Sequence, residues 1–600
     1  MNISFTFRAL ALMFILGLVL NTQSCSKLED LASGTTVYIE TDVLLNPLTI
    51  QIVDAHLGIP LPADISIEVM GKDKDKIFSI MGERTLFVDT NRDDDVAAIL
   101  PIGVRRIENF SVDNPLEFTL KIKADGYMTA IESFSIISER NKMKTVRLLN
   151  LANPVQSVSK ETSDFLAPVG GISADLQISS AMNEEEEMVT IDLEEGTELY
   201  DLEGNKLSGD VHVDLIHYDI HSGEALQLLP GGISVANARD KQGNSLGDMT
   251  FRPMGAISLD MYVGDKEVSA FSEPIEVTFY INGDMKNINT GQNVKEGDLL
   301  EIYSFNELIG EWQMEGDVTV SKDASGHLIA SYLQPHLSTW FIGGGRGCGR
   351  VPATKIFVTN TDVPEDSGER FYLTALYDAD TDELISTESF RFFDGEEIRL
   401  VRTSAFSAYF KIFEGATEDC FNQELFTSAE FETCDDEVFV DLTGLLNASD
   451  FVEINVEVSG SCSTDFNELV ISPTLPILYR PEGCDTWNML GVLLSGTGNT
   501  KALQKGEMYD FRISYRGLER CLLGLEVPAS NTTIEINSPV YDFQETIEVV
   551  YDADGKTIDF IYTDIEVPDL ACQEYVDTFG VGNDDDDHGG TGGGRPGDDD

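Results

Sequence analysis

The stretch VEINVEV, residues 452–458, alternates apolar side chains with acidic or amide ones without interruption. Successive side chains of an extended chain point to opposite faces, so this pattern gives a strand with one apolar and one polar face. The same alternation recurs in ISIEV at 65–69, FTLKI at 118–122 and IEVTF at 275–279. Half-buried strands of this kind are typical of antiparallel sheets with one face on a core. The sequence therefore predicts an all-β chain of tandem antiparallel β-sandwich domains.

Turn signals separate the predicted strands. The motif Asp-x-x-Gly-Asn-x-Leu occurs at 201–207 and again at 240–246. Asp554-Gly555 lies between two alternating segments, which predicts a hairpin. Helical periodicity is plausible only near residues 138–144.

Composition excludes one class of function and sets the scale of the fold. The chain has 600 residues and holds 105 acidic against 40 basic side chains, a formal charge of -65. A surface this acidic repels phosphate, so we expect no nucleic-acid partner. The hydrophobic fraction of 42% is ordinary for a chain that buries cores. At roughly 150 residues per domain, about four domains are expected.

The N-terminus reads as an export signal. Arg8 precedes an apolar run at 9–20 that is too short to span a bilayer. Cys25, preceded by Ser24, then makes residues 1–25 resemble a lipoprotein signal of the Bacteroidetes type, although Thr22 stands where Leu is common and Gln23 where a small residue is expected. The resemblance implies that Cys25 is lipidated. The alternative is an ordinary signal peptide followed by an unrelated cysteine.

The residues after Cys25 bear on where the protein is held. SKLED at 26–30 carries acidic residues and resembles the surface-export signals of the same phylum. We therefore expect an outer-membrane lipoprotein, exposed on the cell surface and held to the membrane by its N-terminal lipid. We further expect the β-sandwich modules to form a strongly hydrated rod.

Composition shifts set the expected domain boundaries. The glycine run at 343–347 is interpreted as a flexible break, 153–162 as a weaker one and 447–449 as a third. Residues 583–600 include no apolar residue, so we expect the tail to be disordered. The predicted order is a signal peptide (1–24), a lipid-anchored tether (25–34), β-sandwich regions at 35–152, 160–345, 348–447 and 451–578, and an acidic Gly/Asp tail (581–600).

Two parts of the chain resemble known families. IVDAHLGIPLP at 52–62, the strand at 65–69 and KADGY at 123–127 together resemble the carboxypeptidase regulatory-like domain, a transthyretin-like β-sandwich. LLPGGI at 228–233, GEWQMEG at 310–316 and PHLSTW at 335–340 look like the extracellular Ig-like β-sandwich region of cartilage intermediate layer proteins. Both resemblances imply non-catalytic modules.

The second resemblance also suggests roles for three residues. We interpret Trp312 and Trp340 as core anchors and His336 as a structural hydrogen-bonding residue. Leu337 departs from the family, which has Phe at that place.

Cysteines predict disulfides in the C-terminal half. Apart from Cys25, the candidates are Cys348, Cys420, Cys434, Cys462, Cys484, Cys521 and Cys572. An exported protein favours disulfides, but seven cysteines leave one unpaired and connectivity does not follow from sequence. Cys420 with Cys434 is our first choice, because the two flank a short acidic loop.

Two constellations could hold a metal. His212, His217 and His221 are interspersed with Asp214 and Asp219, but on a strand His212 and Asp214 face away from His217 and Asp219. We therefore expect solvated strand residues there.

The second constellation resembles half of a calcium loop. Asp89, Asn91, Asp93 and Asp95 alternate as in the first half of an EF-hand, yet Asp94 replaces the turn glycine and Leu100 the closing Glu. The alternatives are a calcium site and an acidic hairpin turn. The acidic segment 378–383 has the same two readings.

No recognised catalytic motif is present in the sequence. We expect Glu184–Glu187 to be a solvated loop, and Trp487 is left as the candidate platform for stacking a sugar. The sequence thus predicts a non-enzymatic surface lipoprotein that has a structural role or binds an extracellular protein or glycan. The alternatives are a calcium-dependent adhesion protein, and an extracellular hydrolase with its site in the C-terminal half.

Overall fold

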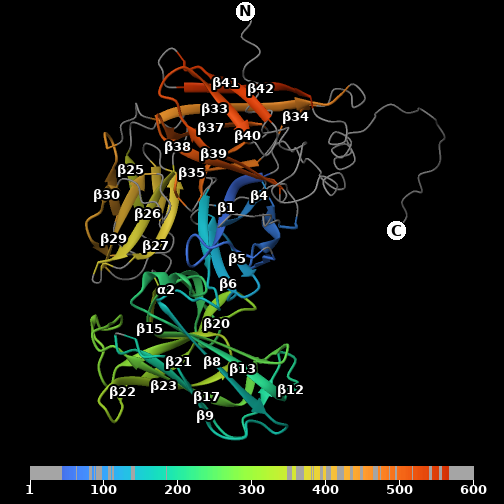
Figure 1. Ribbon diagram of the computed structural model, residues 1–600. Coiled ribbons are helices and arrows are strands. Elements are labelled where there is room, and N and C mark those ends of the chain that lie inside the picture. Colours follow the sequence, from blue (N-terminus) through green and yellow to red (C-terminus); the bar gives the residue numbers. More distant parts are fainter. Residues whose placement is uncertain are drawn as a thin grey trace, which may run out of the picture.

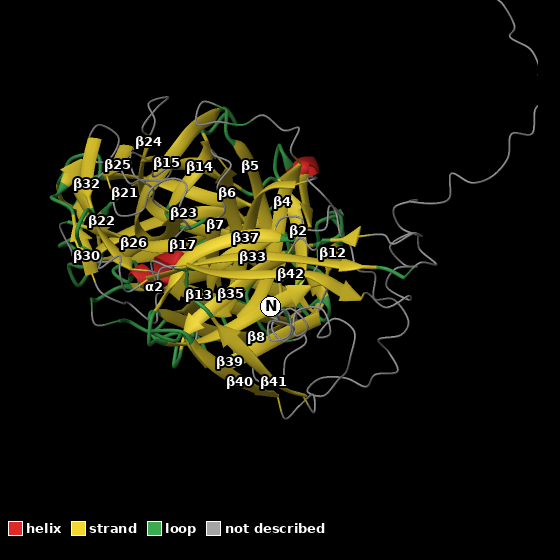
Figure 2. Cartoon of the chain, turned by 90° about the horizontal axis from the view of Figure 1, so that it is seen from above, coloured by secondary structure: helices red, strands yellow, loops and turns green. Residues whose placement is uncertain are grey.

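The computed structural model describes residues 44–566 except at internal gaps. Gaps of seven residues or more are 89–96, 348–354, 360–370, 400–406 and 415–423, and the remaining ones are shorter. The regular structure of the described chain is almost entirely strand, with one short α-helix and one 3-10 turn (Figure 2). The prediction of an all-β fold of tandem β-sandwiches is confirmed. Among the described residues no helix combines the length and the apolar character needed to cross a membrane.

We use the four predicted ranges as working regions. The first region, at the centre of Figure 1, has two facing sheets around one core that includes Ile50, Leu100 and Phe118. One sheet has the order β3 (Ile77–Ser79), β4 (Ala97–Arg105), β1 (Leu44–Asp54), β7 (Lys142–Leu148), and the other β2 (Ser66–Met70), β5 (Leu116–Lys123), β6 (Ala130–Ile136). A 3-10 turn, η1 (Lys74–Lys76), follows β2. The strand β7 runs parallel to β1.

The predicted helix near 138–144 is wrong where the structure describes it. Residues 142–144 begin strand β7, because pairing of Lys142 to Leu148 with β1 buries Val146 and Leu148. Residues 137–141 lie outside the described residues.

The second region is the largest sandwich, at the bottom of Figure 1. Between its sheets lies a core that includes Val213, Leu259 and Trp340. The larger sheet has the order β14 (Ser234–Arg239), β21 (Glu311–Thr319), β20 (Leu299–Asn306), β24 (Thr339–Gly347), β15 (Ser245–Val263), β13 (Gly209–Tyr218), β8 (Val158–Ala167), with β16 (Lys266–Glu267) on β15. The smaller sheet has β12 (Lys206–Leu207), β11 (Leu199–Tyr200), β17 (Ala270–Ile281), β10 (Met188–Leu193), β9 (Leu176–Ser179), then β23 (Leu328–His336) and β22 (Ser321–Lys322). The short strands β18 (Lys286–Asn287) and β19 (Gln292–Asn293) pair with each other.

One end of the larger sheet closes on itself. The strand β14 pairs with β21 and also with the start of β15, so the strands from β14 through β21, β20 and β24 to β15 form a ring. Phe251, Tyr303, Phe341 and Trp312 come from four of these strands, and the rings of Phe251, Tyr303 and Phe341 have centroids 4.9 Å apart. Trp312 also donates its indole N–H to the carbonyl of Pro230 at 2.9 Å. Trp312 and Trp340 are buried, as core anchors should be.

The glycine run at 343–347 is not a flexible break. It forms the end of strand β24 and pairs with β15 from Met249 to Pro253. A Cβ on Gly344 would lie 2.2 Å from Cγ2 of Ile288, and one on Gly345 would lie 2.6 Å from Cε of Met249. Close packing, rather than flexibility, explains these glycines. The weaker break at 153–162 is also partly strand, since β8 begins at Val158.

The third and fourth regions are smaller and lie at the left and top of Figure 1. The third contains β27 (Leu384–Arg391), β26 (Phe371–Asp378), β29 (Ser407–Glu414), β30 (Glu424–Thr427) and β31 (Phe431–Glu432), facing β28 (Glu396–Arg399), β25 (Lys355–Thr359) and β32 (Glu437–Asp441). The fourth contains β34 (Val470–Ile471), β33 (Phe451–Ser461), β37 (Thr497–Gln504) and β42 (Thr557–Glu566), then β36 (Asn488–Leu493), β35 (Leu475–Pro481), β38 (Met508–Tyr515) and β39 (Leu518–Glu526), and the pair β40 (Thr532–Ser538) and β41 (Phe543–Val549).

The predicted hairpin around Asp554 is only partly right. Both strands exist, but β41 pairs with β40 and β42 pairs in parallel with β33. Between the two segments the described residues contain a single bridge, Tyr551 with Ile558. The alternation predicted the strands correctly, whereas the partner of each strand depends on distant segments.

The regions are packed side by side and not strung into a rod. Strand β7 of the first region meets β27 of the third at Met143 and Ser389, which joins their sheets into one of nine strands. A single apolar cluster also draws residues from three regions, for example Ile131, Trp312 and Phe410. The first region is the common neighbour of the other three (Figure 1).

Candidate functional site

Several predicted site residues lie outside the described residues. These are Cys25, the calcium candidates Asp89, Asn91, Asp93 and Asp95, and the cysteines Cys348, Cys420, Cys434 and Cys572. Lipidation, the calcium loop and the pairing of Cys420 with Cys434 therefore stay predictions. Cys521 lies on β39, in register with Arg512 of β38.

Two candidate cysteines are described in full. Cys462 follows β33 and Cys484 follows β35, and both are buried. Both are disulfide-bonded. Which cysteines pair throughout the chain stays open.

Trp487 is not a sugar platform, because it is fully buried. The guanidinium carbon of Arg480 lies 4.4 Å from the centroid of its ring, and that of Arg512 lies 5.6 Å away. Arg480 is itself held by Asp510 at 2.9 Å. Trp487 is thus enclosed by cations in the fourth region and offers no face to a ligand.

The same residues join the fourth region to the first, and we call such a set of contacts between two regions a seam. The backbone N–H of Trp487 donates to Oε1 of Gln51 on β1 at 2.7 Å. Arg512, which is wholly buried, donates to the carbonyl of Ala97 on β4 at 3.2 Å. The bond from the backbone of Trp487 and the bond from Nη1 of Arg512 both cross the boundary between the fourth and the first region.

A second seam joins the second and third regions. Arg252 of β15 bonds Asp378 of β26 at 2.6 Å, with side chains only 16% and 10% exposed. The helix α2 (Gly223–Gln227) packs on β27 so closely that a Cβ on Gly223 would lie 1.7 Å from the carbonyl oxygen of Leu384. Asp378 was a candidate calcium ligand in a hairpin tip. The hairpin between β26 and β27 is present, and the carboxylate of Asp378 is occupied by Arg252.

A third seam joins the first and second regions. The backbone N–H of Gly231 donates to the carbonyl of Ile131 on β6 at 2.6 Å. Lys121 of β5 bonds Glu307, in the turn between β20 and β21, also at 2.6 Å. Backbone pairing and an ion pair thus both cross this boundary.

The three histidines do not converge. His212 bonds Asp164 at 2.7 Å and lies 3.4 Å from Asp214 on one face of β13. His217 lies on the opposite face and is buried in the sandwich, and His221 bonds Glu187 at 3.1 Å. The predicted separation of faces is correct. The expectation of solvated residues is wrong for His217 and Asp214, which are buried, and for Glu187, which is 2% exposed in the loop before β10.

Ser180 and His217 are residue types that can act as a nucleophile and its general base, but a substrate could not reach this pair. Nδ1 of His217 lies 3.2 Å from the hydroxyl of Ser180, and that hydroxyl accepts the N–H of Val189 at 3.0 Å. Burial lowers the pKa of His217 to about 4, so the ring is neutral near pH 7. Both side chains are buried, so this pair connects β13 with the loop after β9 and meets no substrate.

The Asp-x-x-Gly turns explain part of the acidic composition. Asp201 accepts the N–H and the side-chain amide of Asn205, and Asp240 accepts the same groups of Asn244. These hydrogen bonds lower the pKa of both carboxyls. Their oxygens are therefore engaged by turn donors, which makes these turns structural.

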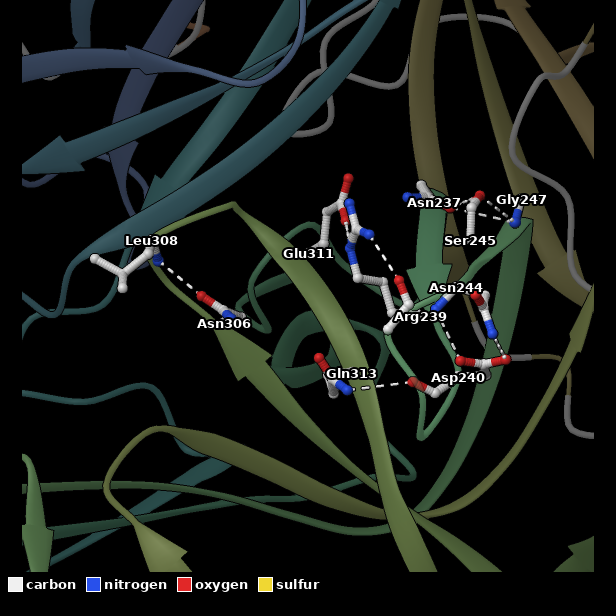
Figure 3. A network of polar contacts seen from close by, with 11 residues as sticks. Asn237, Arg239, Asp240, Asn244, Ser245, Gly247, Asn306, Leu308, Glu311 and Gln313 are labelled. Atoms are coloured by element: carbon white, nitrogen blue, oxygen red, sulfur yellow. Dashed lines mark hydrogen bonds and ion pairs between the residues drawn. The ribbon is translucent and has the colours of Figure 1, made fainter.

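Figure 3 shows how one such turn closes the ring of strands in the second region. Arg239 bonds Glu311 at 2.5 Å and the carbonyl of Gly243 at 2.9 Å. Gln313 donates to the backbone carbonyl of Asp240 at 3.2 Å. These bonds fasten β14 to β21 where the two strands run parallel, so the network holds the fold together.

His336 lies at the end of β23, as a structural residue would. Its Nδ1 lies 3.2 Å from the carbonyl of Leu337, and its ring centroid is 4.8 Å from that of Trp340. Within the described residues, no group of three or more His, Cys, Asp or Glu side chains is arranged to hold a metal ion.

Comparison with known proteins assigns no family. No family model matches the chain, and no curated protein matches it. Among solved structures it is similar to a streptococcal ancillary pilin, at 8% identity over 45% of this chain and 95% of that chain, with a TM-score of 0.12. It is also similar to the shaft pilin SpaA of Lactobacillus rhamnosus GG, at 10% identity over 36% and 96%, with a TM-score of 0.14.

A further similarity is to the major pilin subunit of Bacillus cereus, at 10% identity over 66% of this chain and 99% of that chain, with a TM-score of 0.12. Scores this low do not superpose whole chains. The β-sandwich architecture rests on the sheets described above, and these likenesses carry no statement about function.

The sequence did not reveal the seams. Arg252, Lys121 and Arg512 each lie in an ordinary alternating strand, and their partners are 126, 186 and 415 residues away. A cation within a strand of so acidic a chain is the one local signal that could have marked them.

Proposed function

We propose that this chain is a non-catalytic, cell-surface lipoprotein whose β-sandwich regions act together as one structural and partner-binding body. The observation that carries the proposal is the set of seams around the first region. Buried side chains and backbone bonds join it to the second and fourth regions, and the second and third are joined by a buried ion pair. Larger, buried contacts of this kind oppose relative motion of domains.

A rigid body suits a tethered protein that presents a surface. Lipid on Cys25 supplies the tether, as the N-terminal sequence predicts, and the outer membrane is the proposed site. The burial of Trp487 removes the candidate sugar platform that the sequence offered. We therefore favour an extracellular protein as the partner over a glycan.

The anchor is tested by Cys25→Ala in the native host, with Ser26→Ala as the matched control. The expected result is that Cys25→Ala moves the protein from the membrane fraction to the soluble fraction while the control stays bound. Protease added to intact cells should cut the wild-type protein if it faces outward. Retention of Cys25→Ala on membranes would contradict the lipid anchor.

The non-catalytic role is tested separately on the purified mature chain. A panel of glycan, ester and peptide substrates should show no turnover above a heat-unfolded sample of the same chain. Turnover that disappears on unfolding would overturn the proposal and favour the hydrolase alternative.

A further inference from the structure

Asp260 occupies an unusual electrostatic position on the larger sheet of the second region. It lies on β15 directly opposite Asp214 of β13. Like charges opposite each other on neighbouring strands destabilise a sheet. Asp214 is compensated, since its Oδ1 accepts from Lys160 at 3.1 Å and from Thr162 at 2.8 Å. Among the described residues, neither a hydrogen-bond donor nor a cation is bound to Asp260.

Further carboxylates surround Asp260 from other elements. Within the described residues, Glu267 of β16 and Glu307 of the β20–β21 turn act on Asp260 as like charges, together with Asp214, and Lys160 acts with the opposite sign. Burial and these three carboxylates raise the pKa of Asp260 to about 7. The pKa of Tyr262, on the same strand, is raised mainly by burial and next by the negative charge of Asp260.

The repulsion cannot be relieved without cost. Asp214 and Asp260 are held opposite each other by paired strands, and Glu267 lies on β16, which pairs with β15. Glu307 is held by Lys121 of the first region at 2.6 Å. Ionisation of Asp260 therefore adds repulsion that weakens both the strand pairing and this contact between regions.

We propose that the carboxyl cluster around Asp260 is a pH-sensitive element: it stays closed while Asp260 carries a proton, and it loosens locally as Asp260 ionises. The loosening affects the ends of β13, β15 and β16 and the turn at Glu307. An extracellular protein meets changes in pH directly, so this element would make the second region tighter in mildly acidic surroundings than in alkaline ones.

Hydrogen–deuterium exchange of the mature chain tests this proposal. Wild type, Asp260→Asn and the control Asp210→Asn are compared at pH 5, 6, 7 and 8, with exchange times scaled for intrinsic rates. Asp210 lies on β13 too but is exposed. Asparagine has nearly the shape of a protonated aspartate, so Asp260→Asn should stay protected at every pH.

The expected result is a selective loss of protection in the wild type and in the control. Between pH 5 and 8, protection of β13, β15 and β16 should fall by roughly tenfold to a hundredfold relative to Asp260→Asn. His212 also belongs to this face of the sheet, since its Nε2 lies 3.4 Å from Asp214. Comparison at the same pH cancels the titration of His212 and of His217, which all three chains share. Parallel profiles for wild type and Asp260→Asn would overturn the proposal.

A second variant keeps the test decisive if Asp260→Asn does not fold. Glu267→Gln removes one neighbouring charge from an exposed position. The midpoint of the pH profile should then move to lower pH, because Asp260 would lose its proton more easily. An unmoved midpoint would also overturn the proposal.

Discussion

Removal of Arg252 should expose the energetic role of the seam between the second and third regions. In Arg252→Met the carboxylate of Asp378, which is 10% exposed, loses the guanidinium that lies 2.6 Å away. Breaking a buried ion pair by removing one partner costs about 3–5 kcal/mol, because the remaining charge is left in a poorly solvated place. We expect a loss near the lower end, about 3 kcal/mol, since neither side chain is fully buried.

The exposed pair of Lys241 and Asp317 provides a matched control. Its contact is 2.7 Å, but its side chains are 39% and 44% exposed. An exposed pair is worth about 0–1 kcal/mol, so Lys241→Met should lower the free energy of unfolding by less than 1 kcal/mol.

The assay is urea unfolding of the mature chain, followed by circular dichroism. The double variant Arg252→Met with Asp378→Leu completes a thermodynamic cycle and should recover part of the loss, because the unpaired charge is removed with its partner. Equal, small losses for Arg252→Met and Lys241→Met would refute the reasoning. They would mean that burial of the pair does not decide its contribution.

Three further outcomes follow from burial and packing. Burial lowers the pKa of His217 to about 4, below its ordinary 6.5. The neutral ring therefore contributes stability that is present above pH 6.5 and is lost as the pH falls toward 4. We expect this loss of unfolding free energy to be about 3 kcal/mol in the wild type and smaller in His217→Gln, as measured by acid unfolding. Gly344→Ala should lower the free energy of unfolding by about 1–3 kcal/mol in calorimetry, because its Cβ would lie 2.2 Å from Cγ2 of Ile288. In the control Gly283→Ala the nearest atom is 3.6 Å away, and the loss should be less than about 1 kcal/mol. Equal losses would favour the interpretation of 343–347 as a linker. Trp487→Ala should cost about 3–5 kcal/mol, and an unchanged urea midpoint would show that the burial of Trp487 is not needed for docking of the fourth region.

Local sequence predicted the strands better than their partners. Alternation at 452–458 and at 275–279 identified β33 and β17 correctly, because an apolar face is a local property of the chain. The pairing of β7 with β27 could not be predicted in this way, since the two strands are more than two hundred residues apart. Alternation says that a strand has an apolar face, but not which sheet will cover it.

The errors have a common physical cause. Composition predicts a linker at 343–347 because glycine is common in flexible segments, yet Gly344 and Gly345 leave room for Ile288 and Met249. The sequence likewise predicts accessible side chains for Trp487 and His217, but the fold buries both. Composition reports what a residue could do when exposed, and tertiary packing decides whether it is exposed.

The scarcity of basic residues limits which carboxylates can be paired with a cation. With 105 acidic side chains and only 40 basic ones, most carboxylates cannot find a cation. The turns solve this locally, since Asp201 and Asp240 bind backbone and amide donors. Some of the cations lie where a carboxylate is largely buried or where two regions meet, as with Arg252 and Lys121.

Asp260 is the exception that fits the same reasoning. Its charged neighbours are mainly carboxylates, and Lys160, the cation that acts on it among the described residues, is already bound to Asp214. Protonation is then the remaining way to neutralise Asp260, and its extent depends on the pH of the surroundings. Within the described part of this acidic chain, sensitivity to pH is thus expected where a half-buried carboxylate has neither a turn donor nor a basic partner.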